Sequence, residues 1–175
     1  MLWKTHKVGG VCACVCTAVL LAPKLELTAS PTLAVAGLLF GSLIGSLLPD
    51  IDHPNSTISH KLPLLSKVIT TFFGHRGMTH TFMVLFLTTF LGLFSTVYMP
   101  VVLQTTMVAF FIGYAAGYAS HLFLDALTPA GVPVFFPFYR KNVRLAHIRT
   151  GAHDGFVSFL CICATGVFVY AHYFI

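Results

Sequence analysis

The sequence predicts an all-α integral membrane protein, a helix bundle of about five spans. Of its 175 residues, 57% are hydrophobic and only 9% are charged, whereas the apolar share of a soluble domain is about 45–50%. The apolar residues gather in long uncharged stretches, and crossing the hydrocarbon core takes roughly 20 such residues per helix. We therefore expect residues 1–175 to form a single membrane-embedded helical domain.

Five apolar stretches are the candidate spans. The first is short, and Lys4 and Lys7 precede it as in a secretory signal, but no small-x-small cleavage site follows. We therefore expect it to remain as a membrane helix rather than to be cleaved. In the second, Gly37, Gly41 and Gly45 recur every four residues, a pattern typical of close helix packing. The five stretches run approximately over Val8–Ala22, Thr32–Leu48, Thr79–Tyr98, Val101–Leu124 and Gly155–Ile175.

Loop charge orients these spans, because Lys and Arg accumulate on the cytoplasmic side of a membrane protein. With the amino terminus inside, segments 1–7, 49–78 and 125–154 are cytoplasmic, and they hold every basic residue except Lys24. The side chains that could bind metal fall on the same face, although the charge argument used only Lys and Arg. We therefore predict a polar cluster at the cytoplasmic face, with these candidate metal ligands: His6, Asp50, Asp52, His53, His75, His80, His121 and Asp125.

The first motif in this set is the segment LPDIDHP at residues 48–54. Its two prolines end the second span and stiffen the turn. Carboxylate oxygen and imidazole nitrogen together suit Zn²⁺, Mn²⁺ or Fe²⁺. Aspartates that follow a helix can also act only as caps of the next turn, and we favour metal binding for Asp50 and Asp52.

The second motif is GHRGMTHT at residues 74–81. His75 and His80 are five residues apart, so they converge only if His75 lies in the loop and His80 in the first turn of the third span. Arg76 is then placed to clamp a phosphate or carboxylate with its planar fork. The alternative is that these are polar loop residues without a role.

The third motif is HLFLD at residues 121–125. His121 and Asp125 are four residues apart, so they share one helix face and could chelate one ion. A His–Asp pair that merely locks two helices is the alternative. The following Thr128, Pro129 and Gly131 are expected to form the turn that ends this helix.

Several other chemistries find no support in the chain. There is no Walker loop, no Rossmann glycine fingerprint and no nucleophile elbow. Nothing indicates nucleic-acid binding, since no recognition motif or membrane-free basic helix is present. The five cysteines lack CxxC spacing, and we interpret them as small packing residues.

Four blocks of the sequence together resemble the YdjM family of bacterial inner membrane proteins. They are THKVGG (5–10), LPDIDH (48–53), HRGMTHT (75–81) and HLFLDALTPAG (121–131). Members are described as membrane-bound, metal-dependent hydrolases, some of them under LexA control. The family is also held to be distantly similar to zinc-dependent phospholipase C and P1-type nucleases, which bind metal through His and Asp. The resemblance implies the same eight ligands that the residues themselves suggest.

These observations predict a metal-dependent hydrolase of the bacterial inner membrane, acting on phosphoesters. We expect one to three divalent ions, with zinc favoured, and membrane lipid as the partner and substrate. Arg76, His75 and His53 are the candidate catalytic residues, with Arg76 stabilising phosphate charge. The alternative function is a non-enzymatic membrane scaffold whose His–Asp cluster is a structural metal site.

Overall fold

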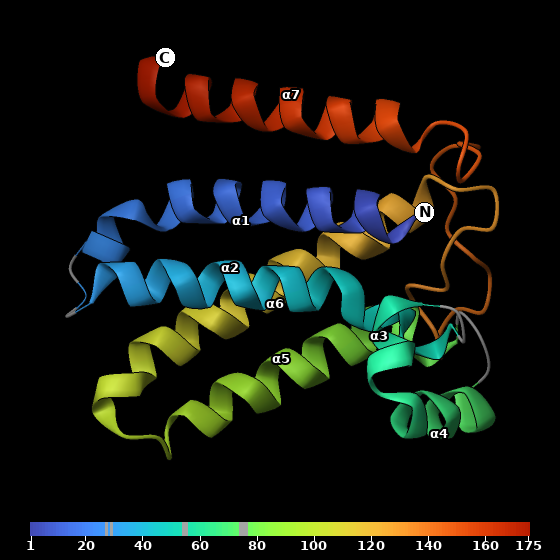
Figure 1. Ribbon diagram of the computed structural model, residues 1–175, viewed down its shortest axis with the longest axis horizontal. Coiled ribbons are helices and arrows are strands. Elements are labelled where there is room, and N and C mark those ends of the chain that lie inside the picture. The colour runs from blue at the N-terminus through green and yellow to red at the C-terminus, as the bar shows by residue number, and fades with distance from the viewer. Residues whose placement is uncertain (27, 29, 54–55, 74–76) are drawn as a thin grey trace.

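A computed structural model of the chain describes residues 1–26, 28, 30–53, 56–73 and 77–175. Within these residues the fold is all-α, and the single β pairing is a bridge between Val132 and Val143. Two short 3-10 turns, η1 and η2, lie between the longer helices. The elements are α1 (Trp3–Glu26), α2 (Pro31–Leu47), η1 (Leu48–Asp52), α3 (Thr57–Lys61), α4 (Pro63–Phe73), η2 (Met78–His80), α5 (Phe82–Thr96), α6 (Val101–Ala126) and α7 (Asp154–Phe174) (Figure 1).

Four of these helical segments are long and apolar enough to cross a membrane: Trp3–Lys24, Pro31–Asp52, Val101–Ala126 and Asp154–Phe174. The expected third span is shorter than the sequence indicated, because α5 has 15 residues and a span needs about 17–25. It begins at Phe82 since the Thr81 side chain caps it, accepting a hydrogen bond from the Val84 amide at 3.2 Å. The predicted bundle is thus confirmed as four membrane-length helices and one shorter apolar helix.

Two features depart from the expected element boundaries. Helix α1 begins at Trp3 rather than near Val8, so His6 lies within the helix and not in a segment before it. The polar stretch after α2 contains the short helices α3 and α4, which the sequence reading treated as loop. Figure 1 shows both helices at the same end of the bundle as the amino terminus.

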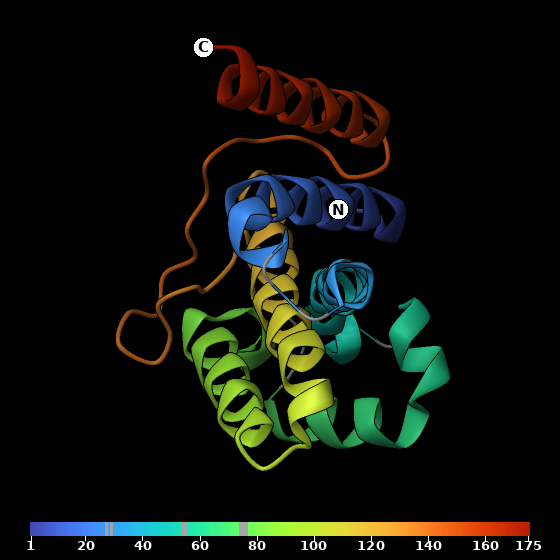
Figure 2. The same cartoon turned by 90° about the vertical axis from the view of Figure 1, so that its left-hand side faces the viewer.

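Helix α6 is the centre of the bundle, with α1, α2 and α5 packed around it (Figure 2). The glycine pattern of α2 is explained by its crossing with α6. A Cβ atom on Gly41 would overlap the carbonyl oxygen of Phe110, and one on Gly45 would overlap that of Tyr114. The reverse holds for Gly117 of α6, whose Cβ would meet the carbonyl of Ser42. The two backbones therefore touch directly, as the four-residue spacing predicted.

The connection from α6 to α7 folds back onto the end of the bundle. Thr128 closes the end of α6 by donating its hydroxyl to the Asp125 carbonyl at 2.7 Å, and Gly131 adopts a positive φ of 64°. Further along, the amide of Leu145 donates to the carbonyl of Ala126, and the amide of Phe82 donates to Val134. This connection therefore satisfies backbone groups at the end of α6 and the start of α5 that would otherwise lack partners.

Candidate metal centre

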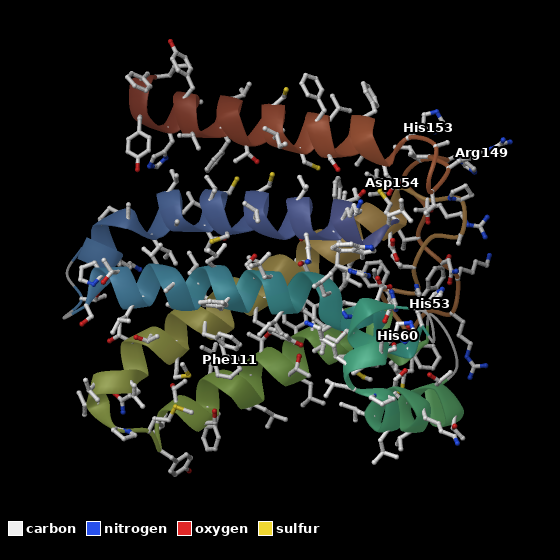
Figure 3. The ribbon with its side chains drawn as sticks, in the orientation of Figure 1. His53, His60, Phe111, Arg149, His153 and Asp154 are labelled. Carbon is white, nitrogen blue, oxygen red and sulfur yellow. The ribbon has the colours of Figure 1, made fainter. Side chains whose placement is uncertain are left out.

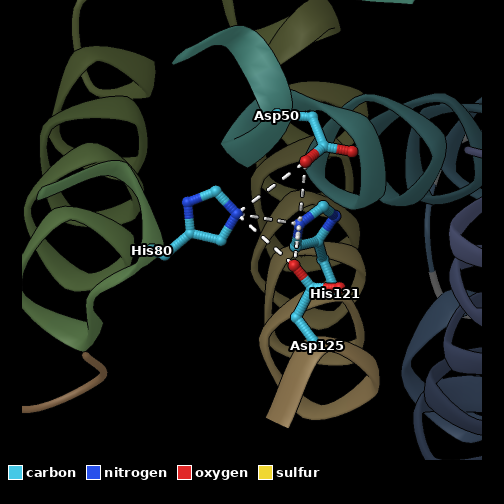
Figure 4. Close-up of side chains that lie close together, drawn as sticks. All are labelled: Asp50, His80, His121 and Asp125. Carbon is cyan, nitrogen blue, oxygen red and sulfur yellow. Dashed lines mark hydrogen bonds and ion pairs between the residues drawn. The ribbon is translucent and has the colours of Figure 1, made fainter. Parts of the chain in front are cut away.

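Residues from three elements converge at the end of the bundle that carries the amino terminus. Asp50 comes from η1, His80 from η2, and His121 and Asp125 from the last two turns of α6. Each of the four offers one nitrogen or oxygen atom, and these four atoms all lie within 4.8 Å of one another. Figure 4 shows the imidazole of His80 pointing from one side at the two carboxylates and at His121.

The distances within this group suit a single small cation. His80 Nε2 lies 3.3 Å from His121 Nε2, 3.8 Å from Asp50 Oδ1 and 3.6 Å from Asp125 Oδ2. His121 Nε2 lies 3.7 Å from Asp50 Oδ1 and 3.6 Å from Asp125 Oδ2. Ligand bonds of about 2.1 Å in a tetrahedral zinc site place the ligand atoms roughly 3.4 Å apart. Five of the six distances between the four atoms are thus close to those of such a site, and the sixth, between the two carboxylates, is within 4.8 Å.

The ring of His121 is oriented from behind by the backbone of α2. Its Nδ1 lies 2.8 Å from the carbonyl oxygen of Ser46, which can only accept a hydrogen bond. Nδ1 therefore carries the proton in the neutral ring, and the lone pair of Nε2 faces the other three side chains. Ser46 reaches this position because the glycines of α2 let its backbone lie directly against α6.

His80 is oriented in the same manner by a side-chain pair. Its Nδ1 lies 3.4 Å from Asp52 Oδ2 and 3.1 Å from the Thr79 hydroxyl. That hydroxyl donates to Asp52 Oδ2 at 2.6 Å, and Tyr118 donates its own hydroxyl to the Thr79 carbonyl. With Nδ1 facing a carboxylate, the Nε2 of His80 is also left as an acceptor. Two acceptor nitrogens 3.3 Å apart repel each other unless a cation lies between them.

His6 contacts two members of the group, His121 and Asp125. The His6 and His121 rings are stacked, with centroids 3.8 Å apart and an interplanar angle of 16°. His6 Nε2 is 3.3 Å from Asp125 Oδ1, and the Met1 amino nitrogen is 2.5 Å from the same oxygen. Asp125 thus turns one oxygen to the four-residue group and the other to His6. The His6 side chain is completely buried, and its Nδ1 has no hydrogen-bond partner in the described part of the chain.

Three of the four side chains in the group are buried, and the fourth is partly exposed. His80, His121 and Asp125 are at most 1% exposed, whereas the side chain of Asp50 is 21% exposed. The Met1 ammonium offsets the charge of Asp125, but two carboxylates and two imidazoles that face one another out of water are still costly without a cation between them. The chemistry of the donor set and its burial therefore fit a bound divalent ion, with Asp50 at the accessible edge.

The sequence reading named eight candidate ligands, and the structure brings six of them into one neighbourhood. Asp50, His80, His121 and Asp125 form the group, His6 contacts Asp125, and Asp52 faces the outer nitrogen of His80. His80 lies in η2, just before α5, and not in the first turn of a helix as expected.

The remaining candidates are not placed in the group. His53 follows η1 and is not one of the four residues; its carbonyl accepts a hydrogen bond from Ser59 at 2.6 Å. His75 and Arg76 lie outside the described residues, so the catalytic roles expected for them stay predictions.

The sequence assigned no role to Ser46 or Thr79, and it offered Asp154 only as a residue that could support the site or contact substrate. The Ser46 carbonyl has no sequence signal, because any residue supplies one. Thr79 stands inside the GMTH motif beside His80, so its position was visible but its contact with Asp52 was not. Asp154 begins α7 and accepts hydrogen bonds from the Leu2 amide and the Thr5 hydroxyl, each at 2.8 Å. Figure 3 shows Asp154 with Arg149 and His153 at this end of α7.

The comparisons with known proteins agree on one family. The family model described as YdjM inner membrane protein matches residues 1–175. The uncharacterized protein YvsG of Bacillus subtilis is 35% identical over 155 residues, which are 87% of this chain and 83% of that protein. The inner membrane protein YdjM of Escherichia coli is 38% identical over 121 residues, which are 69% of this chain and 59% of that protein. No solved structure matches. The chain belongs to the YdjM family.

Proposed function

We propose that this chain is a membrane-bound metal-dependent hydrolase that cleaves phosphoesters at the cytoplasmic face of the membrane. One observation carries the proposal: two histidines, each with its Nδ1 held by an acceptor of the protein, direct their Nε2 atoms at two carboxylates across 3.6–3.8 Å. Such an arrangement of donors is typical of a metal centre with a supporting outer shell.

Asp50, His80, His121 and Asp125 would hold the ion, and zinc, manganese or iron suit this mixture of nitrogen and oxygen ligands. When bound, such an ion lowers the pKa of a coordinated water and polarises a phosphoryl oxygen. Ser46 and the pair Asp52–Thr79 keep the two imidazoles in the tautomer that can bind metal. Asp50, the accessible member, lies at the edge where substrate and water would arrive.

The orientation of the site follows from its position among the basic residues. Lys4, Lys7 and Lys61 belong to segments at the same end of the bundle as the metal centre, and so do Arg140 and Arg144. Lys24 lies in the last turn of α1, at the other end. The bias of basic residues towards the cytoplasm favours placing the centre on that side.

A structural metal site in a non-enzymatic scaffold is the second candidate. The observation that favours it is the burial of His80, His121 and Asp125, since structural sites are closed. The exposed edge at Asp50 favours the hydrolase, because a catalytic site keeps a position open. Removal of the metal from a structural site should lower the unfolding temperature, whereas a catalytic site should lose activity first.

Elemental analysis of the full chain, purified in detergent without chelators, tests the proposal. We expect at least one equivalent of zinc, manganese or iron in the wild type, and none in the double variant Asp50→Ala, His121→Ala. His172→Ala is the matched control, because His172 is exposed at the other end of α7. No transition metal in the wild type after supplementation would overturn the proposal.

The hydrolase is then separated from the scaffold by activity. We expect the metal-loaded wild type to hydrolyse a fluorescent phospholipid in vesicles, and Asp125→Ala to lose that activity while still inserting into the membrane. Full activity in Asp125→Ala would remove this residue from the site. A metal-loaded protein that hydrolyses no phosphoester substrate, and that unfolds at lower temperature when chelated, would identify the scaffold instead.

A further inference from the structure

An apolar groove runs along the outer face of α2, and it is separate from the metal centre. It has a volume of about 620 Å³, which is within the range of roughly 300–1,000 Å³ typical of small-molecule sites. Lys7 of α1 and Lys61 of α3 line it as well, and we call it the lysine groove. Its apolar walls include Phe40, Ile44, Leu47, Ile58 and Leu62.

Because α2 is long and apolar enough to cross a membrane, we expect the groove on its outer face to lie along the membrane normal and to open to lipid. Its wall on α2 extends from Phe40 to Leu48, which corresponds to about 12 Å along a helix. Phe40 and Ile44 are 63% and 43% exposed, so the groove is not closed by protein. The apolar part thus begins where α2 ends, at the level of the headgroups, and extends into the hydrocarbon region.

The two lysines add positive charge at one end of this apolar surface. Neither forms an ion pair with a carboxylate in the described residues, and no Asp or Glu lines the groove. The Lys7 ammonium lies 4.4 Å from the centre of the Trp3 ring, which holds it near the aromatic side chain at the membrane interface. The lysine groove has apolar walls and two ammonium groups without a carboxylate partner among the described residues, and it is therefore complementary to an acyl chain attached to a phosphate.

We propose that the lysine groove binds an anionic phospholipid, with one acyl chain along α2 and the headgroup phosphate between Lys7 and Lys61. The groove lies next to the four-residue group along the chain, because Lys7 follows His6 and Leu48 is two residues before Asp50. A lipid held there presents its phosphoester at the end of the bundle that contains the four-residue group. That this lipid is the substrate rests on the proposed function; that it binds does not.

Native mass spectrometry of the full chain, with added phosphatidylglycerol or phosphatidylcholine of the same acyl chains, tests the headgroup contact. We expect the wild type to retain phosphatidylglycerol in preference. Lys61→Gln should weaken that binding about fivefold, since one basic residue near an anionic lipid contributes on the order of 1 kcal/mol. Lys141→Gln is the matched control, because Lys141 is exposed after α6 and does not line the groove.

A second pair of variants tests the acyl-chain contact without a change of charge. Ile44→Trp narrows the groove at an exposed position and should reduce retention of both lipids severalfold. Leu39→Trp, on the same helix but outside the groove, should leave it unchanged. Equal binding of the two lipids by the wild type, or equal effects within either pair of variants, would overturn the inference. A dimer without bound lipid would do so too and would identify a second copy as the occupant.

The lipid-binding inference and the metal-binding proposal can be overturned separately. The double variant Asp50→Ala, His121→Ala should lose metal and still retain phosphatidylglycerol, because neither residue lines the groove. A wild type that retains phosphatidylglycerol but binds no metal would support the lipid-binding inference and overturn the proposed hydrolase. A wild type that binds metal but shows no preference for phosphatidylglycerol would overturn the lipid inference and leave the proposed hydrolase unaffected.

Discussion

Two helix contacts in this molecule are built in opposite ways. Helices α2 and α6 meet backbone to backbone, since glycines on both faces leave no side chain between them. Helix α7 contacts α1. Among the described residues, Asp154 links the two by accepting from the Leu2 amide and the Thr5 hydroxyl, and it also accepts from the Gly151 amide just before α7. Most of the large side chains of α7, such as Phe156 and Phe159, are exposed.

The contrast matters because the two contacts support different parts of the site. The α2–α6 crossing carries the Ser46 carbonyl, His121 and Asp125, and η1 with Asp50 continues directly from α2. The α1–α7 contact lies beside Met1 and His6, which both face the outer oxygen of Asp125. We therefore expect the metal-binding group to depend on the first contact and to tolerate loss of the second.

The largest effect is expected where the crossing is broken. Gly41→Leu places a side chain against the Phe110 carbonyl, and such overpacking should cost about 3 kcal/mol of folding free energy. Thermal unfolding in detergent measures this, and bound metal should fall with the unfolding temperature. Gly166→Leu on α7 is the control, because a Cβ there meets nothing within 4 Å. Equal unfolding temperatures for the two variants would contradict the backbone contact.

A smaller effect is expected at the polar attachment of α7. Asp154→Ala removes the acceptor of three donors, which should cost about 2 kcal/mol. Hydrogen exchange should become faster in the first turns of α1 and in residues 145–153, while the bound metal remains. Loss of the metal from an inserted Asp154→Ala protein would show that the two contacts are not independent.

The smallest effect is expected from a single hydrogen bond within that attachment. Thr5→Val keeps the shape of a side chain that is 2% exposed and deletes its bond to Asp154. We expect a loss of about 1 kcal/mol in the thermal unfolding experiment. If Thr5→Val lost as much folding free energy as Asp154→Ala, the Thr5 hydrogen bond alone would account for the attachment of α7.

The sequence predicted the fold class and most of the His/Asp group that the structure brings together, because both depend on local patterns. Apolar stretches of about 20 residues reveal spans, and His121 and Asp125 share a helix face whatever surrounds them. The roles of Asp50 and Asp52 could not be separated in this way. They differ only in which side of η1 faces α6, and the packing of that turn decides that Asp50 joins the group while Asp52 supports His80.

The length of α5 was also beyond the sequence pattern. The apolar run that predicted this span was taken to begin with three polar residues, Thr79, His80 and Thr81. In the structure Thr79 and His80 belong to η2, and Thr81 is the N-cap of α5. Their hydroxyls and ring are used in contacts with Met78 and Asp52. Polar residues that bind across the fold look the same in the sequence as polar residues that merely begin a helix.

The four donors of the metal centre are spread from residue 50 to residue 125, and this spacing has a consequence for synthesis. A ribosome delivers Asp50 and His80 to the membrane long before α6 has left the exit tunnel. Until then the two residues belong to an unfinished bundle, and His80 has neither His121 nor Asp125 beside it. If the group binds metal as proposed, the nascent chain can load it only once the central helix has arrived, and a truncation before residue 121 should insert into the membrane and remain without metal.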